Sequence, residues 1–234
     1  MKPNRTGRVG IRVFAFATIL AGMLLVAAAP GAMAADKEDA QGIVDTSRVA
    51  LSELMRDDNY KWMKDHLKDA KGVLIYPQVL KAGFIFGGSG GTGVLLSRDG
   101  KTGDWSNPAF YTMGSVSFGL QIGGESAEVV LLVMTQKAMD SLLTSKFKLG
   151  GDASVALGPV GGGAKSDVTA DFLSFAKSKG LYAGLNLDGS YIDVRESLNK
   201  AYYGQAVTPV DIIVKHSVGN KGADPLREEL KKAK

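Results

Sequence analysis

The sequence contains no cysteine and only two histidines, His66 and His216, among its 234 residues. The absence of cysteine excludes disulfides, thiolate metal sites, cysteine nucleophiles and lipid attachment to a cysteine. Because the histidines are isolated and no acidic residues have ligand spacing, we expect neither a metal site nor any other cofactor. Without disulfides the fold relies on a hydrophobic core, and the ~200 residues that follow residue 34 are enough for one domain.

Long apolar runs are also lacking after residue 34. The start of the chain combines a basic opening, the apolar run VFAFATILAGMLLVAAA and small residues that end at Ala34, which is typical of a cleaved secretory signal peptide. The alternative is a membrane anchor, but the run is short and ends in Pro30-Gly31. We therefore expect the mature protein to be periplasmic or secreted, and able to lie peripherally on a membrane.

Net charge of one sign is absent once the signal peptide is set aside. The chain has 28 Lys and Arg against 24 Asp and Glu, and the signal peptide holds four of the basic residues and no acidic one. The remainder is therefore neutral overall. A nucleic-acid-binding protein needs a clustered basic surface, so we expect no nucleic-acid partner.

Hydrophobic periodicity indicates the fold class. Helical spacing predicts helices over 36–58 and 60–70, and another at 135–144. From Gly72 onward, β-like runs follow one another through glycine or turn residues, and short helical pieces end the chain. This pattern predicts an α+β fold: a glycine-rich, strongly coiled antiparallel β-meander with barrel-like curvature, with N-terminal helices packed on it and short C-terminal helices.

Four segments follow from this pattern: a signal peptide (1–34), an N-terminal helical segment (35–71), a β-rich domain (72–215) and a C-terminal tail with a short helix (216–234). Asp188-Gly189 predicts a two-residue hairpin turn of type I′. Glycine weakens strands unless a sharp coil or a close backbone approach requires it, so the 30 glycines favour a strongly curved sheet.

Three glycine-rich motifs resemble functional loops. Residues 88–93 fit the dinucleotide pattern G-x-G-x-x-G, and Ser89 lies in a G-x-S-x-G pattern with His216 downstream, as in a serine hydrolase. Both motifs require a helix directly after the strand, and the sequence that follows has no helical pattern. Residues 158–166 resemble a phosphate loop, but Ala164 stands where the lysine belongs. We interpret all three as glycine-rich β-structure and turns, and expect no enzyme.

The segment YKWMKDHLKDAK, residues 60–71, carries the candidate binding surface. As a helix it has an apolar face, an adjacent lysine stripe, and Trp62 stacked near His66 on a third strip. The apolar face comprises Tyr60, Met63, Leu67 and Ala70, and the lysine stripe comprises Lys61, Lys64, Lys68 and Lys71. An apolar face bordered by lysines suits a helix that lies in a membrane interface. The alternative is a helix whose apolar face packs on the core and whose lysine edge is solvated.

Ordered glycine-rich segments give a family resemblance. The segments are KGVLIYPQVLKAGFIFG, GTGVLLSRD, GDWSNPAFY, GSVSFGLQIGGE, KLGGDASVALGP, AKSKGLYAGLNLDGSYI and NKAYYG. Together they span about residues 70–204 and resemble the SYLF lipid-binding domain family. The resemblance implies phospholipid binding; eukaryotic relatives bind phosphoinositides at membranes, and some bind actin. The signal peptide places this chain where neither actin nor phosphoinositides are expected, so only binding of anionic phospholipids is carried over.

The sequence therefore predicts an exported, non-catalytic, peripheral protein that recognises anionic phospholipid membranes of the cell envelope. Basic residues near predicted turns could add a rim for phosphate headgroups. The predicted lipid-binding residues are Lys61, Lys64, Lys68, Lys71, Trp62, Lys81 and Arg98. One alternative is a structural or protein-interaction domain with an envelope protein as partner, and a more remote one is a serine hydrolase that uses Ser89.

Overall fold

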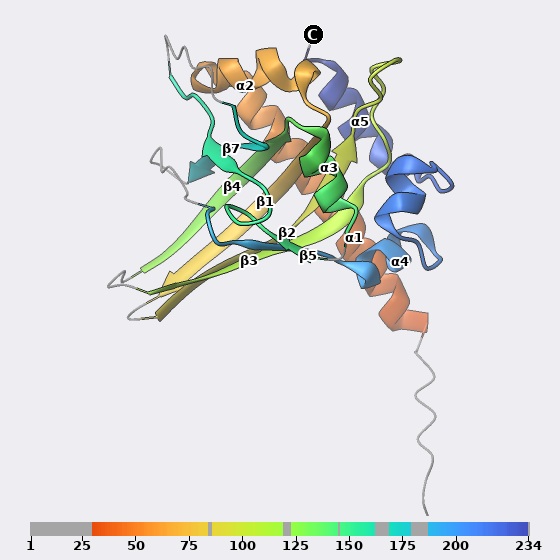
Figure 1. Ribbon diagram of the computed structural model, residues 1–234. Coiled ribbons are helices and arrows are strands. Elements are labelled where there is room, and N and C mark those ends of the chain that lie inside the picture. The colour runs from red at the N-terminus through yellow and green to blue at the C-terminus, as the bar shows by residue number, and fades with distance from the viewer. Residues whose placement is uncertain are drawn as a thin grey trace, which may run out of the picture.

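Eight strands form one sheet that curls into a half-barrel in the computed structural model (Figure 1). The structure describes residues 30–83, 86–118, 123–144, 146–161, 169–178 and 187–233. The strands are β1 (Gly72–Gly83), β2 (Phe86–Ser97), β3 (Ala109–Phe118), β4 (Gly123–Val133), β5 (Lys146–Lys148), β6 (Val155–Leu157), β7 (Phe172–Ser178) and β8 (Tyr191–Val194). Their order across the sheet is β5-β8-β3-β2-β1-β4-β7-β6.

Strand pairing confirms the predicted antiparallel sheet and shows two features that were not predicted. Every pair of neighbouring strands is antiparallel apart from β6 and β7, which run parallel. Strand β4 lies beside β1 and not beside β3, so the meander β1-β2-β3 is extended on its other side. A turn is present at Asp188-Gly189, with Gly189 at a φ of 82°, but the predicted type I′ is wrong, because Asp188 does not have a positive φ. The strand expected before this turn lies outside the described residues.

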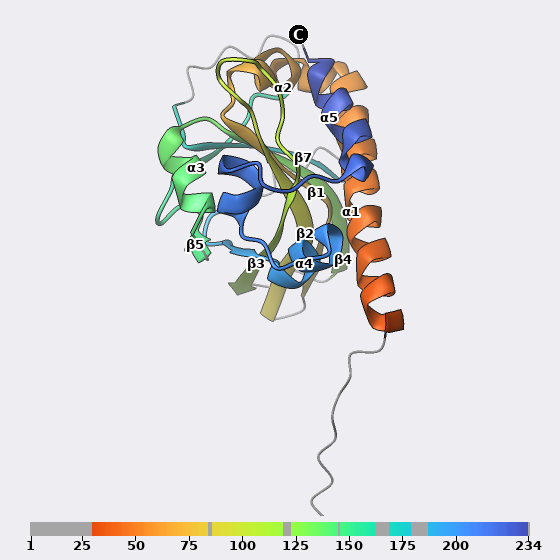
Figure 2. The same cartoon turned by 90° about the vertical axis from the view of Figure 1, so that its right-hand side faces the viewer.

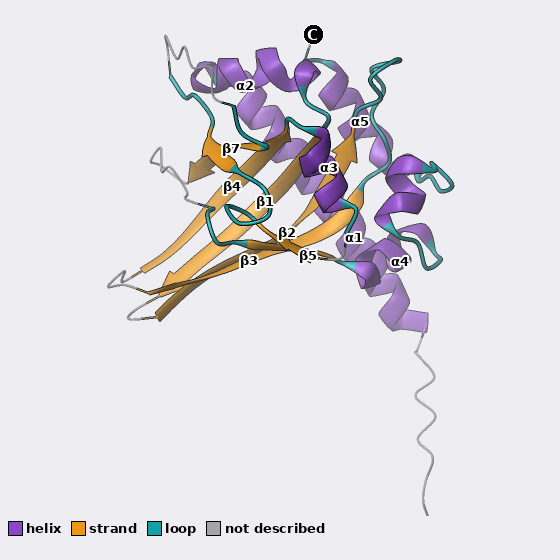
Figure 3. Ribbon diagram, viewed as in Figure 1, coloured by secondary structure: helices purple, strands orange, loops and turns teal. Residues whose placement is uncertain are grey.

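Helices lie at both ends of the chain and between strands (Figure 3). They are α1 (Pro30–Arg56), α2 (Lys61–His66), α3 (Gln136–Leu142), α4 (Glu196–Tyr203) and α5 (Asp224–Lys231), with 3-10 turns at Asp58–Tyr60, Leu67–Asp69 and Lys221–Ala223 and a π-helical turn at Val210–Val214. Most of the predicted signal peptide lies outside the described residues. None of the described helices is long and apolar enough to cross a membrane.

Helix α1 packs on the sheet because its buried residues recur every three or four positions. Ala40, Val44, Ser47, Leu51 and Leu54 are fully or almost fully buried and form one stripe along the helix. Figure 2 shows α1 and α5 running side by side along one edge of the molecule. The acidic residues of α1 remain on its other faces, as expected for a helix that packs on the core.

The sheet is buried on both faces, because alternate residues of its central strands belong to different cores. Val73 and Ile75 of β1 join residues of α1, α2, α4 and α5 in the core that we call the α1-side core. Leu74 and Tyr76 join residues of α3 and of the π-helical turn in the α3-side core. A sheet with two covered faces requires apolar residues at consecutive positions, which explains the runs VLIY and VVLLV.

The glycine-rich motif at residues 88–93 lies entirely within β2, and the strand continues beyond it to Ser97. No helix follows Gly93, so the structure lacks the strand-to-helix turn that a nucleotide-binding or hydrolase motif requires. The pairing of β1 with β2 shifts register between Ile75 and Val79, and this bulge presses the β1 backbone against β2. A Cβ atom at Gly93 would lie 2.9 Å from the carbonyl carbon of Ile75 and closer still to its oxygen. The glycine thus permits close backbone approach.

Asp171, which directly precedes β7, links the residue that caps α3 to Ser154, which directly precedes β6. Its replacement gives a first testable prediction. Its carboxylate accepts hydrogen bonds from Thr135 Oγ1 at 2.6 Å and from the backbone N–H and Oγ of Ser154 at 2.9 Å. These bonds, with Lys137 at 3.6 Å, lower the pKa of Asp171 to about 2. A lowered folded-state pKa stabilises the fold above the unfolded pKa of about 4, and this stabilisation is lost as the pH falls through about 2.

We expect Asp171→Asn to reduce the free energy of unfolding at pH 7 by about 2 kcal/mol. The difference from the wild type should shrink as the pH is lowered below about 4. Urea denaturation across this pH range measures it, with Asp140→Asn, an exposed carboxylate on α3, as the matched control. A difference that stays constant down to the lowest pH would contradict the prediction.

Candidate functional site

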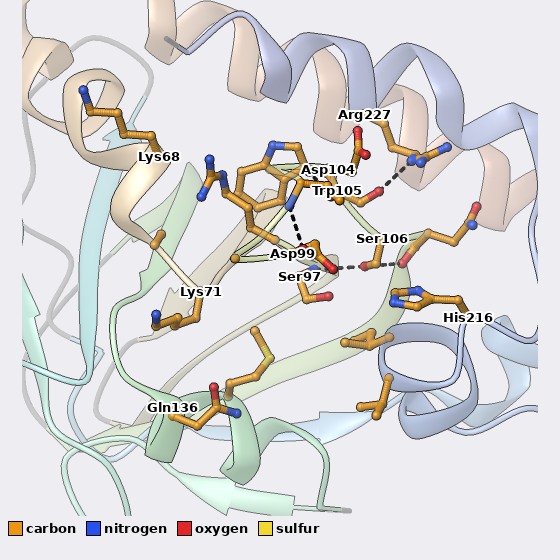
Figure 4. Close-up of a pocket in the computed structure, with 18 of the residues that line it drawn as sticks. Lys68, Lys71, Ser97, Asp99, Asp104, Trp105, Ser106, Gln136, His216 and Arg227 are labelled. Carbon is orange, nitrogen blue, oxygen red and sulfur yellow. Dashed lines mark hydrogen bonds between the residues drawn. The ribbon is translucent and has the colours of Figure 1, made fainter.

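A cleft of about 720 Å³ opens at the end of the sheet where β1 begins and β2 ends (Figure 4). Its walls come from five parts of the chain: the segment before β1, the β2–β3 connection, the start of α3, the segment 213–216 and α5. The cationic and aromatic side chains among its lining residues are Lys68, Lys71, Arg98, Trp105, His216 and Arg227. Most of these groups are polar, so the cleft is suited to a charged ligand.

Lys71 and Arg98 lie next to each other because the β1–β2 hairpin brings them together. Lys71 directly precedes β1 and Arg98 directly follows β2, and the strands pair with Gly72 opposite Ser97. The backbone N–H of Arg98 donates to the carbonyl of Lys71 at 2.9 Å. Among the described residues, neither side chain has an ion pair or a hydrogen-bond partner. Neighbouring cations repel each other, and a bound anion would remove that repulsion.

Two of the three carboxylates at the cleft are already engaged by other groups. Asp99 accepts hydrogen bonds from backbone N–H groups of its own turn, at 2.7 and 2.8 Å, and these bonds lower the pKa of Asp99. Asp104 pairs with Lys231 of α5 at 3.2 Å, which lowers the pKa of Asp104. The third carboxylate is Asp69, which is exposed. Within the described residues, neither of these two carboxylates forms an ion pair with Lys68, Lys71 or Arg98.

The opposite wall of the cleft comes from the C-terminal part of the chain. Arg227 Nε donates to the carbonyl of Trp105 at 2.8 Å, and its Nη1 pairs with Asp224 at 3.1 Å. His216 has a φ of 50° and is the one non-glycine residue with positive φ among those described. It follows the π-helical turn, whose last residue, Val214, is 54% exposed and lines the cleft. In Figure 4, Arg227 and His216 lie across the cleft from Lys68 and Lys71.

The structure corrects one part of the predicted membrane-interface helix. Its apolar face is buried in the α1-side core, with Tyr60, Met63, Leu67 and Ala70 each at most 3% exposed. That face cannot enter a bilayer, because it packs on the sheet and on α1. The alternative of a core-packing helix with a solvated lysine edge is the one observed: Lys61, Lys68 and Lys71 are exposed and Lys64 is half-buried.

The remaining predicted residues of this helix are placed as follows. Trp62 stacks on His66 with ring centroids 3.8 Å apart, as expected, and also on Phe175 at 6.0 Å, so it faces the core more than the solvent. Lys61 pairs with Asp65 at 2.6 Å and is one turn or more from the cleft. Only Lys68 and Lys71 of the lysine stripe line the cleft.

Lys81 does not belong to the same site. It lies on β1 opposite Glu125 of β4 and Ser89 of β2, nine residues from Gly72. At about 3.3 Å per residue, this places it roughly 30 Å from the cleft along the strand. The predicted set is thus divided: Lys68, Lys71 and Arg98 meet at the cleft, and Lys81 lies towards the other end of the sheet.

The proposed nucleophile Ser89 is equally remote from His216. It lies on β2 nine residues before Arg98, roughly 30 Å away along the strand, whereas His216 lines the cleft beside Arg98. Its hydroxyl shares a 2.7 Å hydrogen bond with Ser115 of β3. Within the described residues, no three His, Asp or Glu side chains gather in a way that could hold a metal ion.

Comparison with known proteins identifies the family. The family profile described as "Ysc84: Las17-binding protein actin regulator" matches residues 114–233. The chain is 37% identical over 171 residues to LAS seventeen-binding protein 3 of Saccharomyces cerevisiae, covering 69% of this chain and 36% of that protein. It is 32% identical over 168 residues to SH3 domain-containing YSC84-like protein 1 of Bos taurus, covering 69% and 48%. The chain belongs to the Ysc84, or SYLF, family, and its match spans less than half of these relatives.

Most residues of the cleft were not predicted as site residues, among them Trp105, Gln136, His216 and Arg227. Arg227 was part of a short helix expected in the C-terminal tail, and nothing in its local pattern indicates that α5 returns to the sheet. The sequence did contain one signal for the cleft: Lys71 comes directly before β1 and Arg98 directly after β2. A register that places Gly72 opposite Ser97 also places Lys71 beside Arg98.

Proposed function

We propose that the protein is a peripheral, non-catalytic lipid-binding protein that docks on anionic phospholipid surfaces through the rim of the cleft. The observation that carries the proposal is the convergence of Lys68, Lys71 and Arg98 at one end of the sheet, without ion pairs among the described residues. Each cation near an anionic membrane contributes about 1 kcal/mol of attraction. Membership of the SYLF family adds support, because the family resemblance implies phospholipid binding.

We further propose that the signal peptide is cleaved and that the mature protein acts in the periplasm or outside the cell. The expected cleavage after Ala34 falls near the start of α1, which begins at Pro30. The stripe of buried residues in α1 begins at Ala40, so cleavage would leave that stripe intact.

Vesicle co-sedimentation of residues 35–234 tests the proposed function. We expect recovery with vesicles that contain phosphatidylglycerol and not with vesicles of phosphatidylcholine alone. Because the attraction is electrostatic, raising the salt from about 0.1 M to about 1 M should release the protein, since the screening length falls from about 10 Å to about 3 Å. Equal recovery with both kinds of vesicle, or no recovery with either, would refute the proposal.

A protein partner is the second candidate function, and two observations favour it. The family description names Las17 binding and actin regulation for relatives, whose own length is mostly outside the match. On the edge strand β5, the ammonium groups of Lys146 and Lys148 lie 4.8 and 5.6 Å from the exposed ring of Tyr191. Tyrosine is enriched in protein interfaces relative to the rest of the protein surface. Retention of one defined envelope protein in a lipid-free pull-down would support this function.

A further inference from the structure

We propose that the cleft binds a terminal phosphate group, a phosphate monoester, and that Arg98 is the residue that recognises it. This inference rests on the proposed function, because it names the headgroup chemistry that the cleft would select at the membrane. The phosphate monoester can belong to a lipid headgroup or to a soluble phosphate ester. The argument uses hydrogen-bond capacity, the positions of the cations, the apolar wall and the backbone conformation at the cleft.

Arg98 supplies unused donors at the cleft. Its guanidinium has five N–H groups in a planar fork that matches two oxygens of a phosphate. No hydrogen bond from this side chain to another described residue is present. The side chain is held over the β2–β3 turn, where a Cβ atom at Gly103 would be 3.0 Å from Arg98 Nη2. Gly103 has a φ of 76°, so this turn suits glycine and leaves room for the guanidinium.

Basic side chains line the cleft on both sides, and those of Lys68, Lys71 and Arg227 are charged. Lys68 and Lys71 lie on one side and Arg227 and His216 on the other (Figure 4). A terminal phosphate carries up to two negative charges and three free oxygens, so it can accept hydrogen bonds from both sides at once. A phosphate diester carries one charge and two free oxygens, and it engages fewer of these groups. The arrangement therefore favours the monoester.

An apolar wall adjoins the cations. Ile213, Val214 and Met139 line the cleft, and Val214 is 54% exposed. A large apolar side chain that is exposed beside a cationic cleft can contact the glycerol and acyl part of a lipid whose phosphate is bound by Arg98. This wall favours a lipid over a soluble phosphate ester as the source of the group.

The backbone around His216 is a further, independent observation. A π-helical turn precedes this residue, and such turns are rare and frequent at functional sites. His216 itself adopts a left-handed conformation that non-glycine residues seldom occupy. Unusual backbone of this kind, located at a cationic cleft, is typical of a ligand site.

The test compares two kinds of vesicle that have the same zeta potential. Both consist mainly of phosphatidylcholine, and they contain either phosphatidic acid, a monoester, or phosphatidylglycerol, a diester. We expect the wild type to bind phosphatidic acid vesicles about tenfold more tightly, and Arg98→Gln to bring the ratio of affinities to about one. Lys200→Gln, which removes an exposed lysine on α4, should leave the ratio unchanged. Loss of one positive charge weakens binding to both kinds of vesicle alike, so it does not change the ratio of their affinities.

A second arm uses sn-glycerol 3-phosphate in isothermal titration calorimetry. Weak binding that Arg98→Gln removes, together with the vesicle preference, identifies a lipid as the source. Binding of the soluble compound without any vesicle preference identifies a soluble phosphate ester, and the cleft proposal holds even if anionic vesicles do not bind at all. Equal binding to both vesicles with no binding of glycerol 3-phosphate overturns the cleft proposal and leaves the proposed function intact. A ratio unchanged by Arg98→Gln also overturns it.

Discussion

Replacing Gly93 with alanine is expected to lower the free energy of unfolding by about 3 kcal/mol, although the change adds a single methyl group. The new Cβ atom would meet the carbonyl group of Ile75, and beside it Tyr76 Cδ1 at 2.6 Å. The carbonyl belongs to the backbone of β1 at the start of its bulge, in the middle of the sheet. It cannot move aside without breaking the pairing of β1 with its two neighbours.

Gly90→Ala is the matched control within the same glycine-rich motif. Its Cβ atom would lie 3.4 Å from the carbonyl oxygen of Met113, close to an ordinary contact. We expect its effect to be below about 1 kcal/mol. Urea denaturation of both variants measures the difference, with the slope of the transition as a check that the unfolded states are comparable. Equal effects of the two substitutions would show that the bulge does not explain the glycine at position 93.

Reversing the charge of the lysine stripe is expected to abolish binding to anionic vesicles. The variant replaces Lys61, Lys64, Lys68 and Lys71 with glutamate. At about 1 kcal/mol for each of the two lysines that line the cleft, Lys68 and Lys71, loss of attraction alone weakens binding roughly thirtyfold, and the new negative charges add repulsion. Stability should change by less than about 1 kcal/mol, since these side chains lie at the surface and the Lys61–Asp65 pair is solvent-exposed.

A second charge-reversal variant controls for net charge. It changes four other exposed lysines to glutamate: Lys146, Lys148, Lys200 and Lys221. Both variants alter the net charge equally, so a surface-specific interaction predicts loss of binding only for the lysine stripe. Co-sedimentation of both variants with phosphatidylglycerol vesicles gives the comparison. Similar losses for both would indicate that net charge, and no particular face, controls the association.

The fold class followed from the sequence because its signals are local. The helical spacing at 36–58 and the β-like runs after Gly72 each depend on neighbouring residues, and the structure confirms both. The parallel pairing of β6 with β7 and the position of β4 beside β1 did not follow, because they depend on contacts between distant segments. Turn residues indicate where strands end but do not specify which strands pair.

The helix at 60–71 shows what periodicity leaves open. Its spacing correctly placed Tyr60, Met63 and Leu67 on one face, but the same face suits a protein core and a bilayer equally well. The choice between them depends on whether another part of the chain covers the face. Here Val73, Phe175 and residues of α1 do so, and Phe175 lies more than a hundred positions away in the sequence.

The cleft could not be assembled from the sequence for the same reason. Lys71 and Arg98 are joined by one hairpin, but Gln136, His216 and Arg227 reach the cleft only through the packing of α3, the π-helical turn and α5. All three of these elements are shorter than nine residues, so each offers only a short pattern of its own. Arg98 was predicted as part of a basic rim, whereas the groups that face it were not.

The α1-side core joins α1, α2, α4 and α5 to the same strands, and this has a kinetic consequence for the proposed membrane association. A helix that is free to detach must fold or reorient as it meets the bilayer, and its rate of capture then includes that step. Here the cationic rim is preorganised, so encounter with a charged surface should proceed without a conformational step and at a rate controlled by long-range attraction.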